Sequence, residues 1–506
     1  MTIPACQAEA AALLARLTGA AAPVETHISA VFVGEEEAFK LKKAVALGFL
    51  DFTTLAAREH FCQRELELNR RFAAPGIYRE VLPVTRGPDG ALRLGGEPGE
   101  AMEWVLRMAR IPDDAFLDRI AARGGLTPAL LDGLADAVVA MQEAAERVAG
   151  IDAPAAMRSV IEGNRAAALA AGLPAVRVEA WSAAAGAALQ RLAPVLAARA
   201  AEGRVRRCHG DLHLGNLCLW DGKPTPFDAL EFDEALARID VGYDLAFLLM
   251  DLEARAVAGP ALEEEWRRGL GGRAAANRVL NRVLARTGDY GLLVPLPLWL
   301  SLRAMIRAHV EATRGGEAAP YLAAAEGFLR PAEARVVAIG GLQGTGKSRL
   351  ARALAPALGP APGAVILRTD EIRKRRFGVA PEQRLPPEAY AEPVSEAVHA
   401  ELFAAAEAAA RAGHAAIADA VFLDPANRAG IEAAARAAGV RFDGLWLEAP
   451  LDLLRRRIGA RHHDASDATV AVLERAARTD AGPIAWHRVD ASGDPVPLAR
   501  AALGVH

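Results

Sequence analysis

The segment 341–348 (GLQGTGKS) constrains this chain most, because it matches the pattern G-x-x-x-x-G-K-[ST] at every position. An apolar run at 335–340 precedes it and an amphipathic stretch at 347–358 follows it, so the context predicts a strand, a loop and a helix. Glycines let the backbone turn its N–H groups inward around phosphate oxygens, and a helix start favours an anion. The segment therefore predicts a loop that binds the phosphates of a nucleotide.

Each residue type in this loop has a chemical role. We expect Lys347 to reach the β- and γ-phosphates of ATP and take part in catalysis, and the Ser348 hydroxyl to hold Mg²⁺. The predicted nucleotide-binding residues are Gly341, Leu342, Gln343, Gly344, Thr345, Gly346, Lys347 and Ser348.

Length and composition limit the class of protein to which the chain can belong. A length of 506 residues predicts two to four domains, and 52% hydrophobic with 24% charged residues is ordinary for a soluble protein. A net charge of −4 does not favour bulk nucleic-acid binding, and no segment reaches the about 18 apolar residues of a membrane span. The four cysteines lack metal-ligand spacing, so we expect a reducing, cytoplasmic location without a membrane partner.

Two lysines alternate with apolar residues in the segment 38–43 (AFKLKK), which predicts a strand. Lys40 and Lys42 share one face, which is either solvated or carries the phosphate-anchoring lysine of a kinase-type strand. Such a lysine needs a carboxylate on the following helix, which we expect at 53–72. We assign that role to Glu65, with Glu59 and Glu67 as the other candidates.

The segment 208–216 (CHGDLHLGN) carries further chemistry. Asp211 lies five residues before Asn216, as in the kinase catalytic loop H-R-D-L-x-x-x-N, and Asp228 follows twelve residues later. Phosphoryl-transfer chemistry then gives the roles: Asp211 accepts the proton of the attacking hydroxyl, while Asn216 and Asp228 hold Mg²⁺ on the phosphates. We expect His209 to support the loop and not to transfer protons.

These motifs resemble the aminoglycoside phosphotransferase family, which is related to the protein kinases. The match covers roughly residues 20–330 and includes 239–246 (IDVGYDLA), where Asp240 or Asp244 would support the catalytic loop. The resemblance implies a bilobal α+β domain at 1–330, with a small lobe at about 20–108 and a large lobe at about 109–330. It also favours Lys40 as the kinase-type lysine, with Lys42 as the alternative.

The sequence departs from that family in two places. After Asp228 it continues ALEFD, so Glu231 and Asp233 are candidates for additional metal or substrate contacts. A G-x-G-x-x-G loop over the phosphates is missing, and Gly34 alone is available for the turn. The way the small lobe holds a nucleotide is therefore left open.

Downstream of the phosphate loop, a second strand is expected at 364–368 and leads into 369–376 (TDEIRKRR). Loops after the carboxyl ends of parallel strands line the ligand crevice, which places Asp370 near the reaction centre. Asp370 as a base and Arg373 as a contact for an acidic substrate would share one helix face. The alternatives are that Asp370 caps a helix and that Arg373 belongs to a solvated basic turn.

Two further features complete this half. A third strand is expected to end at Asp419, which would orient Mg²⁺, and a fourth spans 443–449. An arginine-rich helix at 453–461 carries Arg457 and Arg461, which either close over the phosphates as a lid or form a solvated face.

The half from 335 to 490 resembles small P-loop kinases of the zeta-toxin, chloramphenicol phosphotransferase, gluconate kinase and polynucleotide kinase group. The shared features are the phosphate loop, Asp370-x-x-Arg373, the strand-end Asp419 and the lid helix. The resemblance implies an α/β P-loop domain, with a parallel sheet and flanking helices, at 334–506.

Together these features predict an ATP- and Mg²⁺-dependent phosphotransferase with two nucleotide sites and a small-molecule hydroxyl acceptor. Two alternatives stay open: a single P-loop kinase or ATPase that the kinase-like domain regulates, and a nucleic-acid end kinase. The identity of the acceptor, communication between the sites and the oligomeric state do not follow from the sequence.

Overall fold

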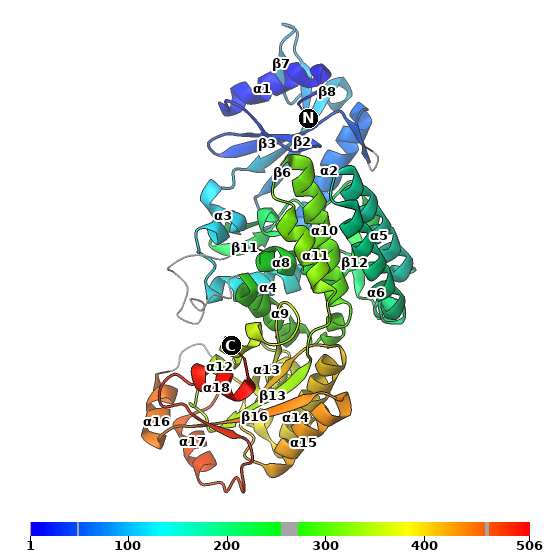
Figure 1. Cartoon of the computed structure of the whole chain (residues 1–506). Helices are drawn as coiled ribbons and strands as arrows, with labels where there is room; N and C mark the ends of the chain where they lie inside the picture. Colours follow the sequence, from blue (N-terminus) through cyan, green and yellow to red (C-terminus); the bar gives the residue numbers. More distant parts are fainter. Residues whose placement is uncertain (1, 48–49, 255–271, 461–464, 506) are drawn as a thin grey trace. The chain divides into compact units, whose positions relative to one another are not determined.

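The computed structural model describes residues 2–47, 50–254, 272–460 and 465–505 (Figure 1). The chain divides into two compact units. The first comprises Met1–Arg123, Ala140–Ile151 and Ala200–Leu245, and the second comprises Gly124–Val139, Asp152–Arg199 and Ala246–His506. The domain boundary expected between residues 330 and 334 stays a prediction.

The first unit is built on a six-stranded antiparallel sheet of order β1-β2-β3-β8-β6-β7. The strands are β1 (Val24–Glu25), β2 (Ser29–Val33), β3 (Glu37–Lys42), β6 (Tyr78–Arg86), β7 (Leu92–Leu94) and β8 (Ala101–Ala109). Small strand pairs are β4 (Ala46–Leu47) with β5 (Leu50–Asp51), β9 (Val205–Arg207) with β12 (Arg238–Asp240), and β10 (Leu217–Trp220) with β11 (Lys223–Pro226). The unit's helices are α1 (Ala8–Thr18), α2 (Leu55–Phe72), α3 (Leu117–Ala122) and α7 (Glu234–Ala237).

Alternation along β3 separates the core from the charged face. Phe39 and Leu41 are buried in one apolar cluster with Leu14 of α1, so Lys40 and Lys42 lie on the opposite face. Helix α2 begins where the Thr54 hydroxyl accepts a hydrogen bond from the Ala57 N–H. Strand β3 and helix α2 therefore carry the lysines and Glu65 as the sequence predicted.

Helices make up the part of the second unit that precedes residue 330. They are α4 (Pro128–Ala144), α5 (Ala153–Ala170), α6 (Ala175–Ala201), α8 (Val241–Ala254), α9 (Gly272–Thr287), α10 (Leu296–Arg314) and α11 (Ala319–Phe328); α4 and α8 each lie partly in the first unit. Helix α5, which the sequence reading did not anticipate, begins at an Asp152 cap that accepts from the Ala155 N–H.

A five-stranded parallel sheet of order β14-β15-β13-β16-β17 completes the second unit. Its strands are β13 (Arg335–Gly341), β14 (Val365–Arg368), β15 (Ala416–Asp419), β16 (Arg441–Glu448) and β17 (His487–Asp490). The accompanying helices are α12 (Lys347–Leu354), α13 (Thr369–Arg376), α14 (Glu392–Arg411), α15 (Pro425–Ala438), α16 (Leu451–Gly459), α17 (Val470–Ala477) and α18 (Val496–Leu503).

Strand order places the phosphate loop at the middle of this sheet. Strand β13 is central, and its neighbours β15 and β16 bury apolar runs that include Ile417 and Leu445. Strand β17 was not expected, because its sequence HRVD contains a single apolar residue. Helix α12 ends at Leu354, short of the expected residue 358, because Pro356 cannot continue it.

The structure confirms the predicted order of an α+β part, built on an antiparallel sheet, and an α/β part with a parallel sheet and flanking helices. Within the described ranges, no helix is both long and apolar enough to cross a membrane.

Candidate functional site

The turn from β13 into α12 requires glycine. Gly341, Gly344 and Gly346 have φ values of 126°, 86° and 92°, a region that other residues rarely adopt. A Cβ atom on Gly341 would also overlap the backbone carbonyl oxygen of Leu447 on β16. The loop therefore holds its shape through close backbone packing on the neighbouring strand.

The two chemical residues of the loop have defined partners. Lys347 Nζ donates to the carbonyl oxygens of Gly341 at 2.9 Å and Leu342 at 3.0 Å, which holds the ammonium group across the loop. Ser348 Oγ donates to Asp419 Oδ2 at 2.5 Å. Asp419 ends β15, so strand order brings the predicted metal residues together, and Arg368 Nε lies 3.3 Å from the same carboxylate.

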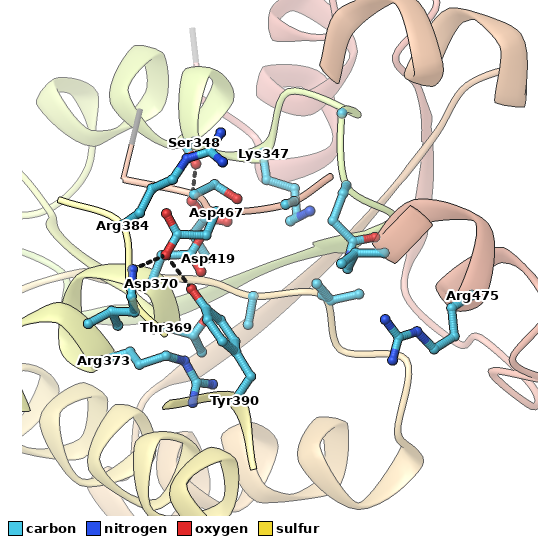
Figure 2. Close-up of a pocket in the computed structure, with 18 of the residues that line it drawn as sticks. Lys347, Ser348, Thr369, Asp370, Arg373, Arg384, Tyr390, Asp419, Asp467 and Arg475 are labelled. Atoms are coloured by element: carbon cyan, nitrogen blue, oxygen red, sulfur yellow. Dashed lines mark hydrogen bonds between the residues drawn. The ribbon is translucent and has the colours of Figure 1, made fainter. Parts of the chain in front are cut away.

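A cavity of about 700 Å³ opens beside the loop (Figure 2). The predicted site residues that line it are Gln343, Gly344, Gly346, Lys347, Ser348, Asp370, Arg373 and Asp419. The structure thus gathers residues from the phosphate loop, from α13 and from the end of β15 around one space, as expected at the carboxyl edge of a parallel sheet.

Asp370 and Arg373 both face this cavity from α13. Burial raises the pKa of Asp370 above its ordinary value, although the charge of Arg368 opposes the shift. Arg373 Nη1 donates to the carbonyl oxygen of Ala389 at 2.5 Å, and its guanidinium lies over the Tyr390 ring, 4.8 Å from the centroid. Helix α13 therefore presents two groups to this cavity: a carboxyl group with a raised pKa and a buried cation.

The sequence reading missed several residues of the same cavity: Arg384, Tyr390, His399, Asp467 and Arg475 line it. Asp467 accepts hydrogen bonds from Tyr390 OH at 2.6 Å and from Lys374 Nζ at 2.7 Å, which ties distant segments together. These residues follow no short motif, so only their positions in the folded chain identify them.

The two predicted lid arginines have different outcomes. Arg457 donates to the carbonyl oxygens of Ala491 at 2.8 Å and Ser492 at 3.2 Å, and it is not among the residues that line the cavity. Arg461 lies outside the described residues. Their role over the phosphates stays a prediction.

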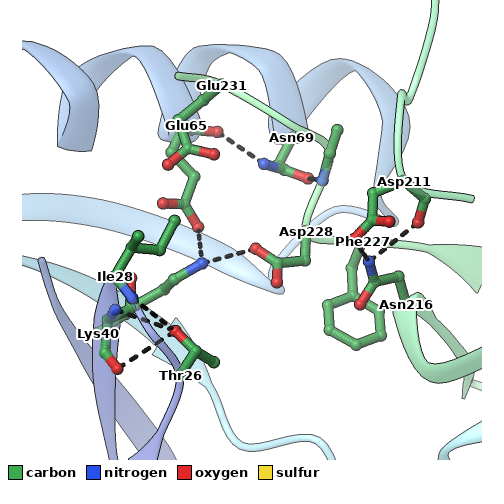
Figure 3. A network of polar contacts seen from close by, with 12 residues as sticks. Thr26, Ile28, Lys40, Glu65, Asn69, Asp211, Asn216, Phe227, Asp228 and Glu231 are labelled. Atoms are coloured by element: carbon green, nitrogen blue, oxygen red, sulfur yellow. Dashed lines mark hydrogen bonds and ion pairs between the residues drawn. The ribbon is translucent and has the colours of Figure 1, made fainter. Parts of the chain in front are cut away.

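In the first unit, Lys40 of β3 joins two predicted partners (Figure 3). Its Nζ lies 2.7 Å from Glu65 Oε1 on α2 and 2.6 Å from Asp228 Oδ1. Burial alone would lower the pKa of Lys40, but the charges of Asp228 and Glu65 raise it well above its ordinary value. Glu65, and not Glu59 or Glu67, pairs with the lysine.

Lys42 extends this arrangement in a way that the sequence did not specify. Its Nζ lies 2.7 Å from Glu65 Oε2 and also pairs with Glu231. Burial raises the pKa of Glu65, but Lys40 and Lys42 outweigh it and lower that pKa to about 2. Glu231 thus contacts a lysine of the sheet, and its role as a metal or substrate contact stays a prediction.

The segment around Asp211 is held in a single conformation. Asn216 Nδ2 donates to Asp211 Oδ2 at 2.9 Å. Of the two aspartates considered as supports for this loop, Asp244 is the one that accepts a hydrogen bond from the Gly210 N–H, at 2.9 Å. His209 is fully buried, its Nε2 lies 2.9 Å from the Phe227 carbonyl oxygen, and burial lowers its pKa. These contacts fit a structural role for His209.

Asp228 has a φ of 59°, an uncommon value for a residue other than glycine. Its N–H donates to Tyr78 OH at 2.9 Å, which holds the backbone there and directs the carboxylate toward Lys40. Such strain is found where the position of a side chain matters to a site.

Both sites contain ligand types that Mg²⁺ accepts. No group of three or more His, Cys, Asp or Glu side chains suited to a metal occurs in the described part of the chain. Mg²⁺ in phosphate-transfer sites uses one or two carboxylates with water and substrate phosphates, so a large cluster is not required. Ser348 with Asp419, and Asn216 with Asp228, fit that smaller requirement.

Comparison with known families defines the class of the second site. Residues 336–482 match the family model described as an AAA domain (AAA_33). This match agrees with the phosphate loop on the central strand of a parallel sheet, and the two observations together indicate a P-loop domain in this part of the chain.

The chain as a whole has relatives in mycobacteria. It is 30% identical over 492 residues to the uncharacterized protein Rv2004c of Mycobacterium tuberculosis (strain ATCC 25618 / H37Rv), a match that covers 93% of this chain and 92% of that protein. The uncharacterized protein Mb2027c of Mycobacterium bovis (strain ATCC BAA-935 / AF2122/97) matches to the same extent. The chain belongs to the family of these proteins.

Solved structures resemble parts of the chain. A gluconokinase from Sinorhizobium meliloti 1021 is 20% identical, covers 35% of this chain and 92% of its own, and has a TM-score of 0.24. A choline/ethanolamine kinase family protein from Mesorhizobium loti is 13% identical. The match covers 63% of this chain and 99% of that protein, with a TM-score of 0.35. At these scores the likenesses add nothing to the assignment of either site.

Proposed function

We propose that this protein is an ATP-dependent phosphotransferase with two nucleotide sites, which transfers the γ-phosphoryl group of ATP to hydroxyl groups of small molecules. The observation that carries the proposal is the 2.5 Å hydrogen bond from Ser348 Oγ to Asp419 Oδ2, in the same cavity as Lys347 and Asp370. A nucleotide loop, a metal-binding pair and a base in one space are the parts that phosphoryl transfer needs.

In the P-loop site, the backbone N–H groups of 341–346 and the Lys347 ammonium bind the phosphates. Ser348 and Asp419 would hold Mg²⁺, which would neutralise phosphate charge when bound. Asp370 accepts the proton of the acceptor hydroxyl, and its raised pKa favours this proton transfer. Arg373 holds the acceptor in position.

In the kinase-like site, Glu65 orients Lys40 toward the phosphates, and Asn216 and Asp228 bind Mg²⁺. Asp211 accepts the proton of its own acceptor hydroxyl, and the hydrogen bond from Asn216 fixes the direction of that carboxylate. Lys40 also pairs with Asp228, which places the lysine beside a residue that we propose as a Mg²⁺ ligand.

A second candidate is that the kinase-like unit binds a ligand and regulates the P-loop site without transferring phosphate. The missing glycine-rich loop and the Lys40–Asp228 ion pair favour it. A nucleic-acid end kinase is a further alternative, and it predicts affinity for oligonucleotides that falls steeply with salt.

The test is ADP release by the full chain with Mg²⁺ and a panel of hydroxyl compounds. A general base contributes about 10²–10⁴-fold to the rate of turnover. Asp211→Ala should therefore slow turnover at the kinase-like site by that factor, and Asp370→Ala should do so at the P-loop site. The double variant should be slow at both sites. Asp113→Ala and Asp452→Ala, at exposed carboxylates that pair with surface arginines, are the controls.

The outcomes separate the candidates. Loss of all activity in Asp370→Ala, with Asp211→Ala unchanged, would favour the regulatory reading of the first unit. Full activity in both single variants and in the double variant would show that the assigned bases are wrong.

A further inference from the structure

Strand β14 lies at one edge of the parallel sheet and leads directly into α13, the helix that carries Asp370. One side of its backbone pairs with β15, beginning where the Val365 N–H donates to the Ala415 carbonyl oxygen at 2.8 Å. Among the described residues, no strand pairs with the other side. Backbone N–H and C=O groups at a covered edge need other partners, and those partners help to fix where α13 begins.

Helix α9 supplies these partners through two asparagine side chains. Asn281 Oδ1 accepts a hydrogen bond from the Ile366 N–H at 2.6 Å, and Asn281 Nδ2 donates to the Ala364 carbonyl oxygen at 3.2 Å. Asn277, which is 3% exposed, donates to the same carbonyl oxygen at 3.0 Å. A side-chain amide satisfies both a donor and an acceptor of the backbone, as a neighbouring strand would. Helix α9 therefore closes the edge of the sheet at the strand that precedes Asp370.

The end of α9 also holds α13 itself. Arg375 of α13 donates from Nη1 to the carbonyl oxygen of Ala285, in the last turn of α9, at 3.0 Å. The last carbonyl groups of a helix lack partners within the helix and carry partial negative charge, so a guanidinium is a favourable partner. The same guanidinium lies 5.7 Å from the centroid of the Tyr290 ring, and its Nη2 lies 2.6 Å from Glu401 Oε1 on α14. Arg375 thus fixes α13 against two other helices.

A third contact of α9 reaches the segment that follows α13. Arg282 pairs with Asp136 of α4 at 2.7 Å and with Glu382 at 2.6 Å. Glu382 lies two residues before Arg384, which lines the cavity. All of these residues belong to the second compact unit. Helix α9 therefore contacts the strand before Asp370, the helix that carries it and the segment that comes next.

The α9 residues in these contacts lie before residue 336, where the match to the P-loop family begins. The support that they give to α13 is therefore a feature of this longer chain. The phosphate loop follows β13, and β15 lies between β13 and β14. Loosening of β14 and α13 should therefore displace Asp370 more than the phosphate loop.

We propose that Asn281 and Arg375 are positioning residues of the P-loop reaction, which fasten β14 and α13 to α9 and so hold Asp370 beside the acceptor hydroxyl. This rests on the phosphotransferase function proposed above, in which Asp370 is the base. Neither positioning residue is among those that line the cavity, so both act through the backbone that carries Asp370.

The reaction explains why this position matters. The acceptor hydroxyl gives its proton to Asp370, and its oxygen forms a bond to the γ-phosphorus of ATP. The bond from that phosphorus to the β–γ bridging oxygen breaks, and ADP leaves with the electron pair. A displacement of about 1 Å at a reacting group can slow such a step by about 10²-fold, although the group itself is unchanged.

The experiment measures ADP release by the full Asp211→Ala chain, in which the base proposed for the other site is removed. The probes are Mg-ATP with water alone and with glycerol as the hydroxyl compound. Asn281→Ala and Arg375→Gln, each added to this chain, should lower kcat about tenfold to hundredfold. KM for ATP should stay unchanged, because the phosphate loop keeps its position on the central strand.

Matched variants separate positioning from a general loss of stability. Asn427→Ala removes the same type of side chain from α15, outside these contacts. Arg376→Gln removes the guanidinium next to Arg375; Arg376 pairs with Glu401 at 3.0 Å and takes no part in the contacts with α9 described above. Both should keep the kcat and KM of the Asp211→Ala chain. Arg375→Lys keeps the charge and a donor, so it should retain part of kcat, and it replaces Arg375→Gln if that variant fails to fold.

The proposal is overturned if Asn281→Ala and Arg375→Gln keep full kcat, if KM for ATP rises in step with the fall in kcat, or if the matched variants lose as much. Failure of the proposed function is a separate result, in which Asp370→Ala releases ADP as fast as the chain that retains Asp370, or neither releases any. Loss of turnover in Asp370→Ala alone would keep the base and remove the positioning role.

Discussion

At the scale of single residues, five charged side chains of the first unit form an alternating series. In spatial order it runs Glu231, Lys42, Glu65, Lys40 and Asp228, with each lysine between two carboxylates. Lys42 and Glu65 are fully buried and Glu231 is 5% exposed. In such a series, the position of Lys40 depends on Glu65, and the position of Glu65 depends on Lys42 and Glu231.

Replacement of Glu231 by alanine should destabilise the protein by about 3–5 kcal/mol, because Lys42 loses one of its two buried partners. Glu67→Ala is the matched control, since Glu67 pairs with Arg64 and Arg71 at the surface and should cost about 0–1 kcal/mol. Urea unfolding of the full chain measures both. Equal effects of the two changes would contradict the importance of the buried series.

The raised pKa of Asp370 predicts how turnover at the P-loop site depends on pH. A base must be ionised, so activity is full above the raised pKa and falls as the pH drops through it. We expect the acid limb to lie above about pH 3.9, the ordinary value for aspartate. ADP release by the Asp211→Ala chain, measured against pH, isolates this site. An acid limb at or below the ordinary value would count against Asp370 as the base.

At the scale of elements, the turn from β13 into α12 forms the P-loop site. Gly341 belongs to β13 and contacts the backbone of β16, while Gly346 caps α12 in open space. Both glycines have positive φ, but only Gly341 is also confined by a neighbouring strand. The position of the loop therefore depends on sheet pairing as well as on backbone flexibility.

Gly341→Ala should abolish nucleotide binding at this site and lower stability, because the new Cβ overlaps the carbonyl oxygen of Leu447. Gly346→Ala meets no atom within 4 Å and suffers only the cost of its φ, about 1–2 kcal/mol. Nucleotide affinity and thermal unfolding of the two variants test this. The expectation fails if Gly346→Ala is the more damaging change.

At the scale of the whole molecule, the chain contains two compact units; the phosphate loop lies in the second, and Lys40, Glu65 and Asp228 lie in the first. The match to the mycobacterial relatives covers 92% of their own length, so these relatives align with both units of the chain and not with one unit alone. The function we propose gives each unit its own nucleotide site, so the number of nucleotides bound per chain tests it directly.

Equilibrium dialysis with Mg²⁺ and AMPPNP should therefore give two nucleotides per chain. Lys347→Ala and Lys40→Met should each give one, because each removes a cation from one phosphate site, and the double variant should give none. Asp452→Ala, at an exposed position, should leave two. One nucleotide in the unchanged chain, lost only in Lys347→Ala, would restrict nucleotide binding to the P-loop site.

Local motifs predicted much of this arrangement. The phosphate loop, the Asp211 and Asn216 spacing and the Glu65 assignment depend on short segments or on one strand and the next helix. Strand β17 and the residues Arg384, Tyr390, Asp467 and Arg475 escaped prediction, because no local pattern distinguishes them from surface residues. Arg457, expected either at the phosphates or on a solvated face, contacts backbone carbonyl oxygens after β17, and its role as a lid residue stays a prediction.

The fold class and the residue types at the candidate sites could be predicted from short segments, because glycine geometry, strand alternation and motif spacing act over a few residues. Only the tertiary structure decided which charges meet. It paired Lys42 with Glu231, 189 positions away, and left Arg373 alone among the cations of α13 without a carboxylate. Ion pairing depends on distances of a few ångströms between distant segments, and chain order does not specify those distances.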